Sequence, residues 1–528
     1  MCPRIKRPES EGQRAMQIQE RDPRSRLGPG VWLTALVSLS LHLLPHPGYG
    51  FHRDELLYLA MGDHLDLVRM SFPPMIAVLA QAGRALPLDL LTAIRLLPAL
   101  AAATLPILTA LICQELGGGR RAQLLAAVAV LAAPLFLRAG TLFQPVVFEQ
   151  VWWCVAALAL AKLLAGRDRR WWLVLGAAVG ASVLTKFSVA FLGAGLLVAI
   201  VLSPLRHDVR TRWPWLGVAL AGILALPSLT GQIAWGWPFV AQARALQATQ
   251  LGHFDRLDFL VGQFLMLGPG FPLWLVGLIA LLAAPTLRPF RPLGLLAVTV
   301  FLLLLLTGGK DYYFGPMHTL LIAAAAAFVG VWLEKRGKVP VFAGALALLI
   351  LGGVVLLPMG VPLLPPPLMA RYAAALGITQ ATRTNYGGTL RLPQDFADMT
   401  GWREQVEAVA SVFRALPPNE QIGAAILGDN YGRTGAVALF GPQFGLPYPI
   451  SRHGDFYYWG TGHRNGEVTI IIGGTAEEWR QYWDEVTEAA RSRNPWGVDE
   501  EQSVPIFVCR RPRLDLPSLF RHLGPYWG

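Results

Sequence analysis

Charged residues are scarce in this chain of 528 residues. Asp, Glu, Lys and Arg together make up 15% of the residues, and hydrophobic residues make up 54%. In soluble domains roughly a quarter of the residues are charged. The composition therefore excludes an ordinary soluble protein. Apolar stretches of about 17 to 25 residues, the length that crosses a bilayer as a helix, recur between Val31 and Leu357. We expect an all-α, polytopic membrane protein over this part of the chain.

Cysteine is also rare, with four residues in the whole chain. Cys113 and Cys154 lie within apolar stretches, Cys2 lies in a basic N-terminal segment, and Cys509 stands alone near the C-terminus. This spacing supplies neither a disulfide framework nor a CxxC metal site. The net charge of +11 does not indicate nucleic-acid binding, because the basic residues gather in alternate short loops.

Hydropathy predicts about eleven transmembrane helices. They lie near residues 31–46, 88–116, 121–138, 145–165, 171–184, 187–204, 213–233, 258–283, 293–306, 314–333 and 339–358. The first follows a basic segment, residues 1–28, which gives it the flanks of a signal peptide. A small-x-small cleavage site is missing there, so we predict an uncleaved anchor preceded by a cytoplasmic tail.

The loops between these helices differ in charge from one side to the other. With the N-terminus inside, every loop predicted to be cytoplasmic is basic: GGGRR (117–121), GRDRR (166–170), LRHDVRTR (205–212), TLRPFRP (286–292) and EKRGK (334–338). The opposite loops are neutral, acidic or aromatic. This asymmetry follows the positive-inside rule, and an odd number of crossings then places the C-terminal region outside.

The chain changes character after the prolines of PMGVPLLPPPL, residues 358–368, which mark a linker. We therefore divide it into a transmembrane domain, residues 29–358, and a small extracytoplasmic α/β domain, residues 359–528. In the latter, GWREQVEAVASVFRAL has helical spacing, and QIGAAILG, EVTIIIGG and VPIFVCR are strand candidates. TAEEWRQYWDEV is predicted to be a helix opened by a Thr475/Glu478 capping box.

The first outer loop, residues 47–86, contains two amphipathic stretches, FHRDELLYLAMGDHL and RMSFPPMIAVLAQAGRAL. Both are too short or too polar to cross the bilayer, so we expect helices along the membrane surface. Asp54 and Glu55 then lie at the outer interface. Adjacent side chains on a helix point about 100° apart, so at most one of them faces a given cavity. Two interpretations stay open: interfacial ions paired with other loops, or a carboxylate that acts as a general base.

Further polar residues are predicted at the same outer level. Glu149 begins the fourth span, Lys186 lies at the turn after the fifth, and TGGKDYYFGPMH (307–318) precedes the tenth. Glu149 could simply neutralise Lys186, and the tyrosines of the third segment suit an aromatic belt. The coincidence of acids and cations at one level favours a polar cavity at the lipid boundary.

Metal binding has only weak support in the sequence. His52, His64 and His253 lie near acids, but their spacing matches no ligand motif. No cofactor is certain, and a divalent metal remains an open alternative.

Several motifs in order resemble the glycosyltransferase 39 family, which includes protein O-mannosyltransferases and the aminoarabinose transferases of lipid A. They are FHRDELLYLAMGDHL, SFPPMIAVLA, FQPVVFEQVWW, LTKFSVAFLGAGLLVAIVLSP, GWPFV and GGKDYYFGPMHTLL, and GDNYGRTGAVALFGPQFGLPYPIS resembles the tail of many bacterial members. The resemblance implies the GT-C fold, a place in the bacterial cytoplasmic (inner) membrane, and transfer of a sugar from a polyprenyl phosphate to an acceptor outside.

The same resemblance implies roles for individual residues. The essential acidic motif of the family falls on Asp54 and Glu55, with Asp54 the better candidate for the catalytic base. The paired prolines that close the second surface helix fall on Pro73 and Pro74. The sequence departs from the family at Gln144 to Glu149, where many bacterial relatives have Met-Asn-Ala-Phe-Glu, and at Ser451 to His453, where Ser-Gly-His is frequent.

A mechanism follows as a hypothesis. Asp54 removes the acceptor proton, and Lys310, together with Arg53 or Lys186, neutralises the lipid phosphate, with inversion at the anomeric carbon. The cleft is expected to be lined by Tyr58, Pro73, Pro74, Glu149, Asp311, Tyr312 and Tyr313. The partners would be a polyprenyl-phosphate sugar, membrane lipids, and a lipid, glycan or protein acceptor. Two alternatives remain: a transporter or flippase of a lipid-linked sugar, and a non-catalytic assembly or sensor protein.

Overall fold

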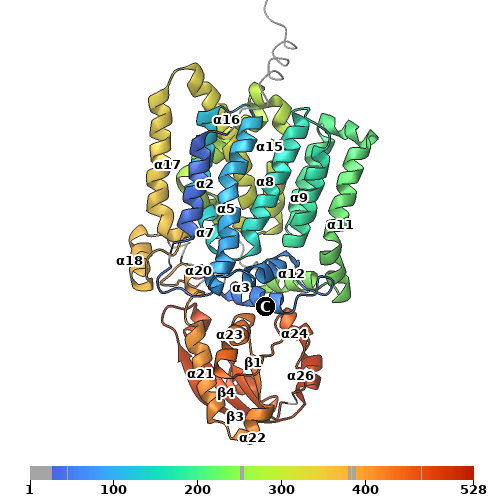
Figure 1. Ribbon diagram of the computed structural model, residues 1–528, viewed down its shortest axis with the longest axis vertical. Helices are drawn as coiled ribbons and strands as arrows, with labels where there is room; N and C mark the ends of the chain where they lie inside the picture. Colours follow the sequence, from blue (N-terminus) through green and yellow to red (C-terminus); the bar gives the residue numbers. More distant parts are fainter. Residues whose placement is uncertain are drawn as a thin grey trace, which may run out of the picture.

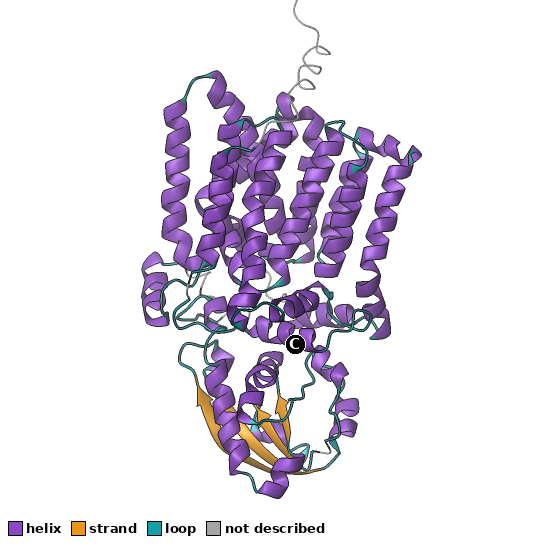
Figure 2. Ribbon diagram, in the orientation of Figure 1, coloured by secondary structure: helices purple, strands orange, loops and turns teal. Residues whose placement is uncertain are grey.

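The computed structural model describes residues 27–44, 46–249, 255–378, 382, 388–464 and 466–527. Most of the predicted cytoplasmic tail, including Cys2, lies outside the described residues, as does His253. The described chain forms a helical bundle with a smaller domain at one of its ends (Figure 1). Strands occur only in the smaller domain (Figure 2). The prediction of a polytopic helical protein with a small C-terminal α/β domain is confirmed.

Long apolar helices make up the bundle. They are α2 (Pro29–His42), α5 (Leu90–Glu115), α6 (Arg120–Leu131), α7 (Pro134–Thr141), α8 (Pro145–Leu164), α9 (Trp171–Thr185), α10 (Val189–Val201), α11 (Arg212–Ala234), α13 (Arg256–Leu267), α14 (Phe271–Ala283), α15 (Arg291–Thr307), α16 (Gly315–Lys335) and α17 (Val339–Gly360). Among the described residues, seven segments are long and apolar enough to cross a membrane, or nine if each of two bent pairs is one span. Every predicted span falls on these helices, with α2 and α9 as shorter apolar ones.

One of the bent pairs brings the chain toward the smaller domain. Helices α6 and α7 meet at 62°, and Ala133 between them has an extended backbone with Pro134 as the first residue of α7. A proline disfavours helical geometry in the residue before it, so the helix stops and restarts in a new direction. The second pair, α10 and η1 (Pro204–Arg210), bends by 92°.

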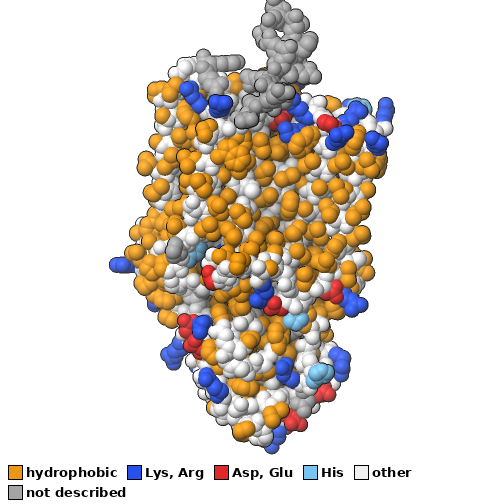
Figure 3. Space-filling model, in the orientation of Figure 1, with side chains coloured by type: hydrophobic (Ala, Val, Ile, Leu, Met, Phe, Trp, Pro, Cys, Tyr) orange, Lys and Arg blue, Asp and Glu red, His pale blue; other side chains and the backbone are white. Residues whose placement is uncertain are grey.

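Charge is distributed unevenly over the bundle. Its flank is almost wholly hydrophobic, and Lys and Arg side chains gather along the end that lies away from the smaller domain (Figure 3). The short connections at that end include the basic loops 117–121 and 166–170, η1, and η4 (Pro285–Phe290). Acidic and basic side chains also occur at the junction of the two parts (Figure 3).

The predicted surface helices lie between the bundle and the smaller domain (Figure 1). They are α3 (Arg53–Asp63) and α4 (Met75–Arg84), and they pack through buried Leu57, Met61, Ile76 and Ala80. Helices α12 (Pro238–Thr249) and α18 (Pro366–Leu376) lie at the same end. One expectation is wrong: Pro73 and Pro74 do not close the second surface helix but precede it, with Pro74 as its N-cap, a place where a missing backbone N–H costs little.

The smaller domain is built on one four-stranded sheet of order β1-β2-β4-β3. The strands are β1 (Ala425–Gly428), β2 (Val468–Ile472), β3 (Trp483–Arg493) and β4 (Ser503–Pro512); β1 and β2 are parallel and the other pairs antiparallel. The helices are α20 (Gln394–Ala397), α21 (Trp402–Ala415), α22 (Pro418–Gly423), α23 (Tyr431–Phe440), α24 (Asp455–Trp459), α25 (Ala476–Trp479) and α26 (Leu516–Leu523). Helices α21 and α23 pack on one face of the sheet, and α25 and α26 on the other.

One segment of this domain differs from its prediction. Thr475 does cap a helix, but α25 ends at Trp479, and the residues from Trp483 onward form the edge strand β3. Antiparallel pairing with β4 supplies backbone hydrogen bonds that the local helical pattern does not anticipate. The predicted strands β1, β2 and β4 and helix α21 are present.

Each part of the protein inserts a side chain into the core of the other. Leu56 of α3 is fully buried in the core of the smaller domain, and Phe456 of α24 is buried among the surface helices. The backbone N–H of Gly50 donates to the carbonyl of Met399 over 2.8 Å. These contacts fix the smaller domain on the first loop.

Candidate active site

A capping box fixes the first turn of α3. The imidazole of His52 accepts a hydrogen bond from the backbone N–H of Asp54, and the carboxylate of Glu55 accepts one from the backbone N–H of His52 over 2.8 Å. Two backbone N–H groups at the helix start are thereby satisfied. Asp54 and Glu55 also lie where the helix dipole stabilises negative charge.

Glu55 is completely buried, and each of its carboxylate oxygens accepts two hydrogen bonds. Arg95 of α5 donates to both of its carboxylate oxygens, over 3.1 and 3.0 Å, and the backbone N–H of Phe143 donates over 3.0 Å. Burial alone would raise the pKa of Glu55, but the charge and hydrogen bonds of Arg95 outweigh it and the pKa is lowered. The expected catalytic role of Glu55 does not fit this placement, because a carboxylate so enclosed has no oxygen left for a substrate.

Asp54 points away from Glu55, as adjacent positions on a helix require, and stays half-buried. Its Oδ2 accepts a hydrogen bond from Nε2 of Gln144 over 2.8 Å. Its Oδ1 accepts one from the hydroxyl of Tyr431 over 2.9 Å. Two neutral donors therefore hold the carboxylate, and each oxygen keeps a lone pair for another donor.

Arg53 is engaged by the smaller domain. Its guanidinium lies 3.1 Å from Asp398 and 3.8 Å from Glu501, and it also contacts Glu500. Burial raises the pKa of Asp398 to about 6 even though Arg53 opposes that effect. The expectation that Arg53 neutralises a donor phosphate conflicts with this placement, because acids of the smaller domain already occupy it.

Lys186 lies between an acid and two aromatic rings. Its Nζ is 3.3 Å from a carboxylate oxygen of Glu149, and 4.9 and 4.0 Å from the ring centroids of Tyr312 and Tyr313. Ser188 donates to the other oxygen of Glu149. The pairing of Glu149 with Lys186 is thus present, and cation–π contacts add to it.

A second pair of charged residues lies next to this group. Arg138 of α7 makes a two-pronged ion pair with Asp395 of α20, one arm of which spans 2.7 Å. Lys310 precedes η5 (Asp311–Phe314), and burial, together with the charge of Lys186, lowers its pKa to about 8, while the charges of Asp54 and Asp311 oppose this. The charges of Asp54, Lys186, Arg138 and Asp311 all act on Lys310, so these groups share one neighbourhood.

The remaining predicted site residues surround this group. Tyr58 is buried one turn beyond Asp54, with its ring centroid 6.4 Å from that of Phe143. Asp311 accepts a hydrogen bond from the backbone N–H of Tyr312 over 2.8 Å, and Pro73 and Pro74 are buried at the start of α4. Asp54, Lys186, Lys310 and the two tyrosines come together as the sequence indicated.

Residues that sequence reasoning missed complete the group. Arg138 is a lone arginine at the end of an apolar run, and a charge in such a run is a signal of function. Gln144 lies in a motif that departs from the family pattern. Asp395 and Tyr431 come from a region with no local signal that links it to the bundle.

The part of the chain that the structure describes holds no cluster of metal-ligand residues here. Within the ranges that it describes, no group of three or more His, Cys, Asp or Glu residues could hold a metal ion. His52 caps α3, and His64 stacks on Trp459 with ring centroids 4.1 Å apart.

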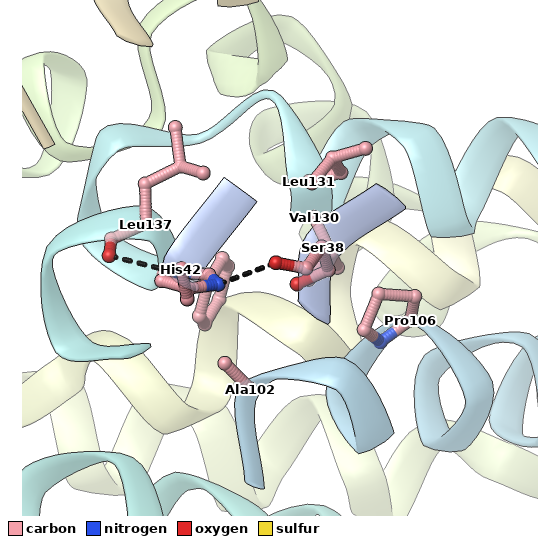
Figure 4. A pocket seen from close by; sticks show the side chains of 8 residues that line it. Ser38, His42, Ala102, Pro106, Val130, Leu131 and Leu137 are labelled. Atoms are coloured by element: carbon pink, nitrogen blue, oxygen red, sulfur yellow. Dashed lines mark hydrogen bonds between the residues drawn. The ribbon is translucent and has the colours of Figure 1, made fainter. Parts of the chain in front are cut away.

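A small cavity lies elsewhere in the bundle. It is lined by Ser38, His42, Ala102, Pro106, Val130, Leu131, Phe136 and Leu137. Figure 4 shows His42 held between the carbonyl oxygens of Ser38 and Leu137, at 2.6 and 2.9 Å from its ring nitrogens. The lining contains no acid and no lysine, so this cavity is not the polar group around Asp54.

Comparison with known proteins agrees with this architecture. The computed structure resembles the crystal structure of ArnT from Cupriavidus metallidurans bound to undecaprenyl phosphate, with a TM-score of 0.56, 15% sequence identity, and coverage of 90% of this chain and 97% of that one. The apo form of the same ArnT gives the same values. The chain has the GT-C fold of membrane glycosyltransferases. At this level of identity the likeness concerns the fold alone.

A family model adds sequence evidence. Residues 71–230 match the model described as dolichyl-phosphate-mannose-protein mannosyltransferase, and the resemblance to the glycosyltransferase 39 family is confirmed. No curated protein matches the chain. The matched residues include Arg138, Gln144, Glu149 and Lys186, whereas Asp54 lies before them.

Proposed function

We propose that this protein transfers a sugar from a polyprenyl-phosphate-linked donor to an acceptor, with Asp54 as the general base and with inversion at the anomeric carbon. One observation carries the proposal: a half-buried carboxylate is fixed by Gln144 and Tyr431, and its charge acts on Lys310 together with the charges of Lys186 and Arg138. These are the groups that deprotonation of an acceptor and departure of a phosphate require.

The proposed transfer needs only the donor, the acceptor and Asp54 to account for every bond and proton. The acceptor oxygen or nitrogen forms a bond to the anomeric carbon while the bond from that carbon to the phosphate oxygen breaks. The acceptor proton goes to Asp54, and the leaving electron pair stays on the polyprenyl phosphate. Attack from the side opposite the leaving group inverts the anomeric centre.

Fixed positive charge is what the leaving group needs. Lys186 and Arg138 are each held by a carboxylate, through Glu149 and Asp395, so their positions are set before the donor binds. Preorganised charges stabilise a developing phosphate anion without the cost of reorganisation. We propose that Lys310, Lys186 and Arg138 bind the lipid phosphate, while Tyr58, Asp311, Tyr312, Tyr313, Glu149, Pro73 and Pro74 line the cleft.

A lipid-linked donor suits the position of the site. Helix α3, which carries Asp54, lies between the bundle and the smaller domain (Figure 1), and we propose that this level corresponds to the lipid headgroups. The similar ArnT structure contains undecaprenyl phosphate, which belongs to the same class of lipid. The acceptor would be a lipid, glycan or protein that approaches from the aqueous side.

The charge asymmetry of the loops supports one orientation. The basic connections gather at the end away from the smaller domain, and such loops remain on the cytoplasmic side. We therefore propose that the protein lies in a bacterial cytoplasmic membrane with the smaller domain and the site on the outer face.

The function is tested with the full chain in bilayer nanodiscs supplied with a panel of radiolabelled polyprenyl-phosphate sugars and a cell-envelope extract as acceptor source. The proposal predicts sugar transfer and release of free polyprenyl phosphate from at least one donor. Asp63→Asn, an acid-to-amide change at the far end of the same helix, should retain this turnover, and Asp54→Asn should lose it.

A transporter or flippase of the same lipid would give a different result. It would bind a donor tightly without releasing polyprenyl phosphate, and in proteoliposomes it would move the intact donor across the bilayer. That outcome would replace the proposed transferase.

A further inference from the structure

The smaller domain reaches the carboxylate that the proposed reaction depends on. Tyr431, the first residue of α23, donates its hydroxyl proton to Oδ1 of Asp54 over 2.9 Å. Gln144 holds Oδ2 from the bundle side over 2.8 Å. The carboxylate is thus oriented jointly by two parts of the protein that are far apart in the sequence.

Contacts within the smaller domain fix the position of Tyr431. Asn430 caps α23 by accepting from the backbone N–H of Arg433 over 2.9 Å. Arg433 is buried and bound by Glu501, 3.1 Å away, and by Asp429. A tyrosine at the first turn of a helix anchored this way has little freedom to move away from Asp54.

Two glycines allow α23 to lie directly on α3. A Cβ at Gly432 would lie 2.7 Å from Cγ of Arg53 and 2.8 Å from the ring of Trp402, and a Cβ at Gly435 would lie 2.9 Å from Cβ of Leu56. These distances are too short for any other residue without a shift of one helix. The close approach brings the Tyr431 hydroxyl within hydrogen-bonding distance of Asp54.

The same domain also holds the neighbour of Asp54. Arg53 is bound by Asp398, Glu500 and Glu501. The smaller domain therefore holds the first turn of α3 through the side chain of Arg53 as well as through the carboxylate of Asp54. Burial and the charge of Asp54 raise the pKa of Tyr431 well above its usual range. The phenol therefore stays protonated and remains a donor.

We propose that Tyr431 is a positioning residue for Asp54 and that the smaller domain is an integral part of the active site rather than a separate module. This inference rests on the proposed function of Asp54. A donated hydrogen bond fixes the carboxylate toward the acceptor, while a lone pair on Oδ1 remains for the acceptor proton.

The test compares Tyr431→Phe with wild type in nanodiscs, using the radiolabelled donor that wild type turns over. Tyr482→Phe is the matched control, since it removes the same hydroxyl from a half-buried tyrosine of the same domain that packs on Trp483. We expect Tyr431→Phe to lower kcat by about tenfold to a hundredfold with the KM for the donor within about twofold. Tyr482→Phe should match wild type.

The split between kcat and the donor KM separates positioning from a merely structural effect. Loss of the hydrogen bond from Tyr431 to Oδ1 of Asp54 should lower kcat and leave the donor KM within about twofold. A general loosening of the site would instead change kcat and the donor KM together.

A double-mutant cycle guards against a folding artefact. In an Asp54→Asn background, Tyr431→Phe should cause little further loss, because its effect acts through the carboxylate. Losses that multiply in the double variant, or an unchanged kcat in Tyr431→Phe, would overturn the inference and leave the proposed function standing. Absence of turnover by wild type would instead remove the proposed function and the inference with it.

Discussion

The hydroxyl of Tyr431 lies 2.9 Å from Oδ1 of Asp54, although 377 positions of the sequence separate the two residues. On the other side of the carboxylate, Gln144 belongs to the transmembrane bundle, at the N-cap of α8. The acid is therefore held at the junction of the bundle and the smaller domain. Each prediction below concerns one contact of this junction.

Removal of the amide of Gln144 should impair the chemical step. Gln144→Met keeps the side-chain length but takes away the donor to Oδ2 of Asp54, so the carboxylate loses part of its orientation. We expect kcat to fall about tenfold or more with unchanged donor KM. Gln123→Met is the matched control, because Gln123 donates to the backbone carbonyl of Gly118 in the basic loop 117–121. Equal losses in both variants would show a general effect on the bundle.

Arg138 and Asp395 should behave differently although they form one ion pair. Arg138→Gln removes a cation from the proposed phosphate site and should raise the donor KM about tenfold or more, since hydrogen bonds to charged groups contribute about 1.5 to 3 kcal/mol. Asp395→Asn leaves that cation in place and should retain donor affinity. If the two variants weaken donor binding equally, Arg138 serves to anchor α20 and does not bind phosphate.

Donor affinity should depend on pH through Lys310. Its pKa is lowered to about 8 by burial and by Lys186, and a bound phosphate would raise that pKa. The ammonium is charged below pH 8, so its contribution to binding is complete there and is lost as pH rises further. We expect the donor Kd to increase by up to about tenfold between pH 8 and pH 9.

The matched variant for this pH dependence is Lys310→Arg. A guanidinium stays charged throughout that range, so its Kd should remain flat between pH 8 and pH 9. Binding is measured with radiolabelled donor in nanodiscs. A wild-type Kd that does not change in this interval would remove Lys310 from the phosphate site.

Loss of Arg53 should loosen the attachment of the smaller domain. Arg53→Met leaves Asp398 buried without its cation, while Glu501 keeps its ion pair with Arg433. Breaking a buried ion pair from one side costs about 3 to 5 kcal/mol; part of that is screened because Arg53 is slightly exposed. We expect faster proteolysis of the linker after α17. Arg403→Met, which breaks an exposed pair with Glu407, should change little, since such pairs contribute about 0 to 1 kcal/mol.

The same variant examines the earlier expectation for Arg53. A phosphate-binding arginine would give a higher donor KM with an unchanged rate of proteolysis. The contacts of Arg53 with Asp398 and Glu501 predict faster proteolysis of the linker after α17 and a lower kcat for sugar transfer.

Most of the fold could be predicted because its signals are local. Apolar runs specify the membrane helices, amphipathic spacing indicates the surface helices, and the apolar strand β2 is recognisable from its sequence. Strand β3 could not be predicted, because its helical pattern is overridden by pairing with β4. The role of the prolines before α4 was inverted, since family likeness gives the position of a motif and not its place in a turn.

The candidate site was predictable only where its residues lie on surface loops of the bundle. Asp54, Lys186 and Lys310 could be assigned to one level from hydropathy alone. Glu55 and Arg53 could not be separated from Asp54, because their partners Arg95, Asp398 and Glu501 are distant in sequence. Tyr431 and Asp395 depend on docking of the smaller domain, which leaves no local pattern.

The central claim is that Asp54 acts as a base in sugar transfer from a lipid phosphate. Its most direct test measures donor Kd and the single-turnover transfer rate of Asp54→Asn and wild type in the same nanodisc preparation. The account predicts a Kd within about threefold of wild type and a rate at least about a hundredfold lower, the usual contribution of a general base. A transfer rate equal to that of wild type, or a loss that lies entirely in Kd, would contradict it.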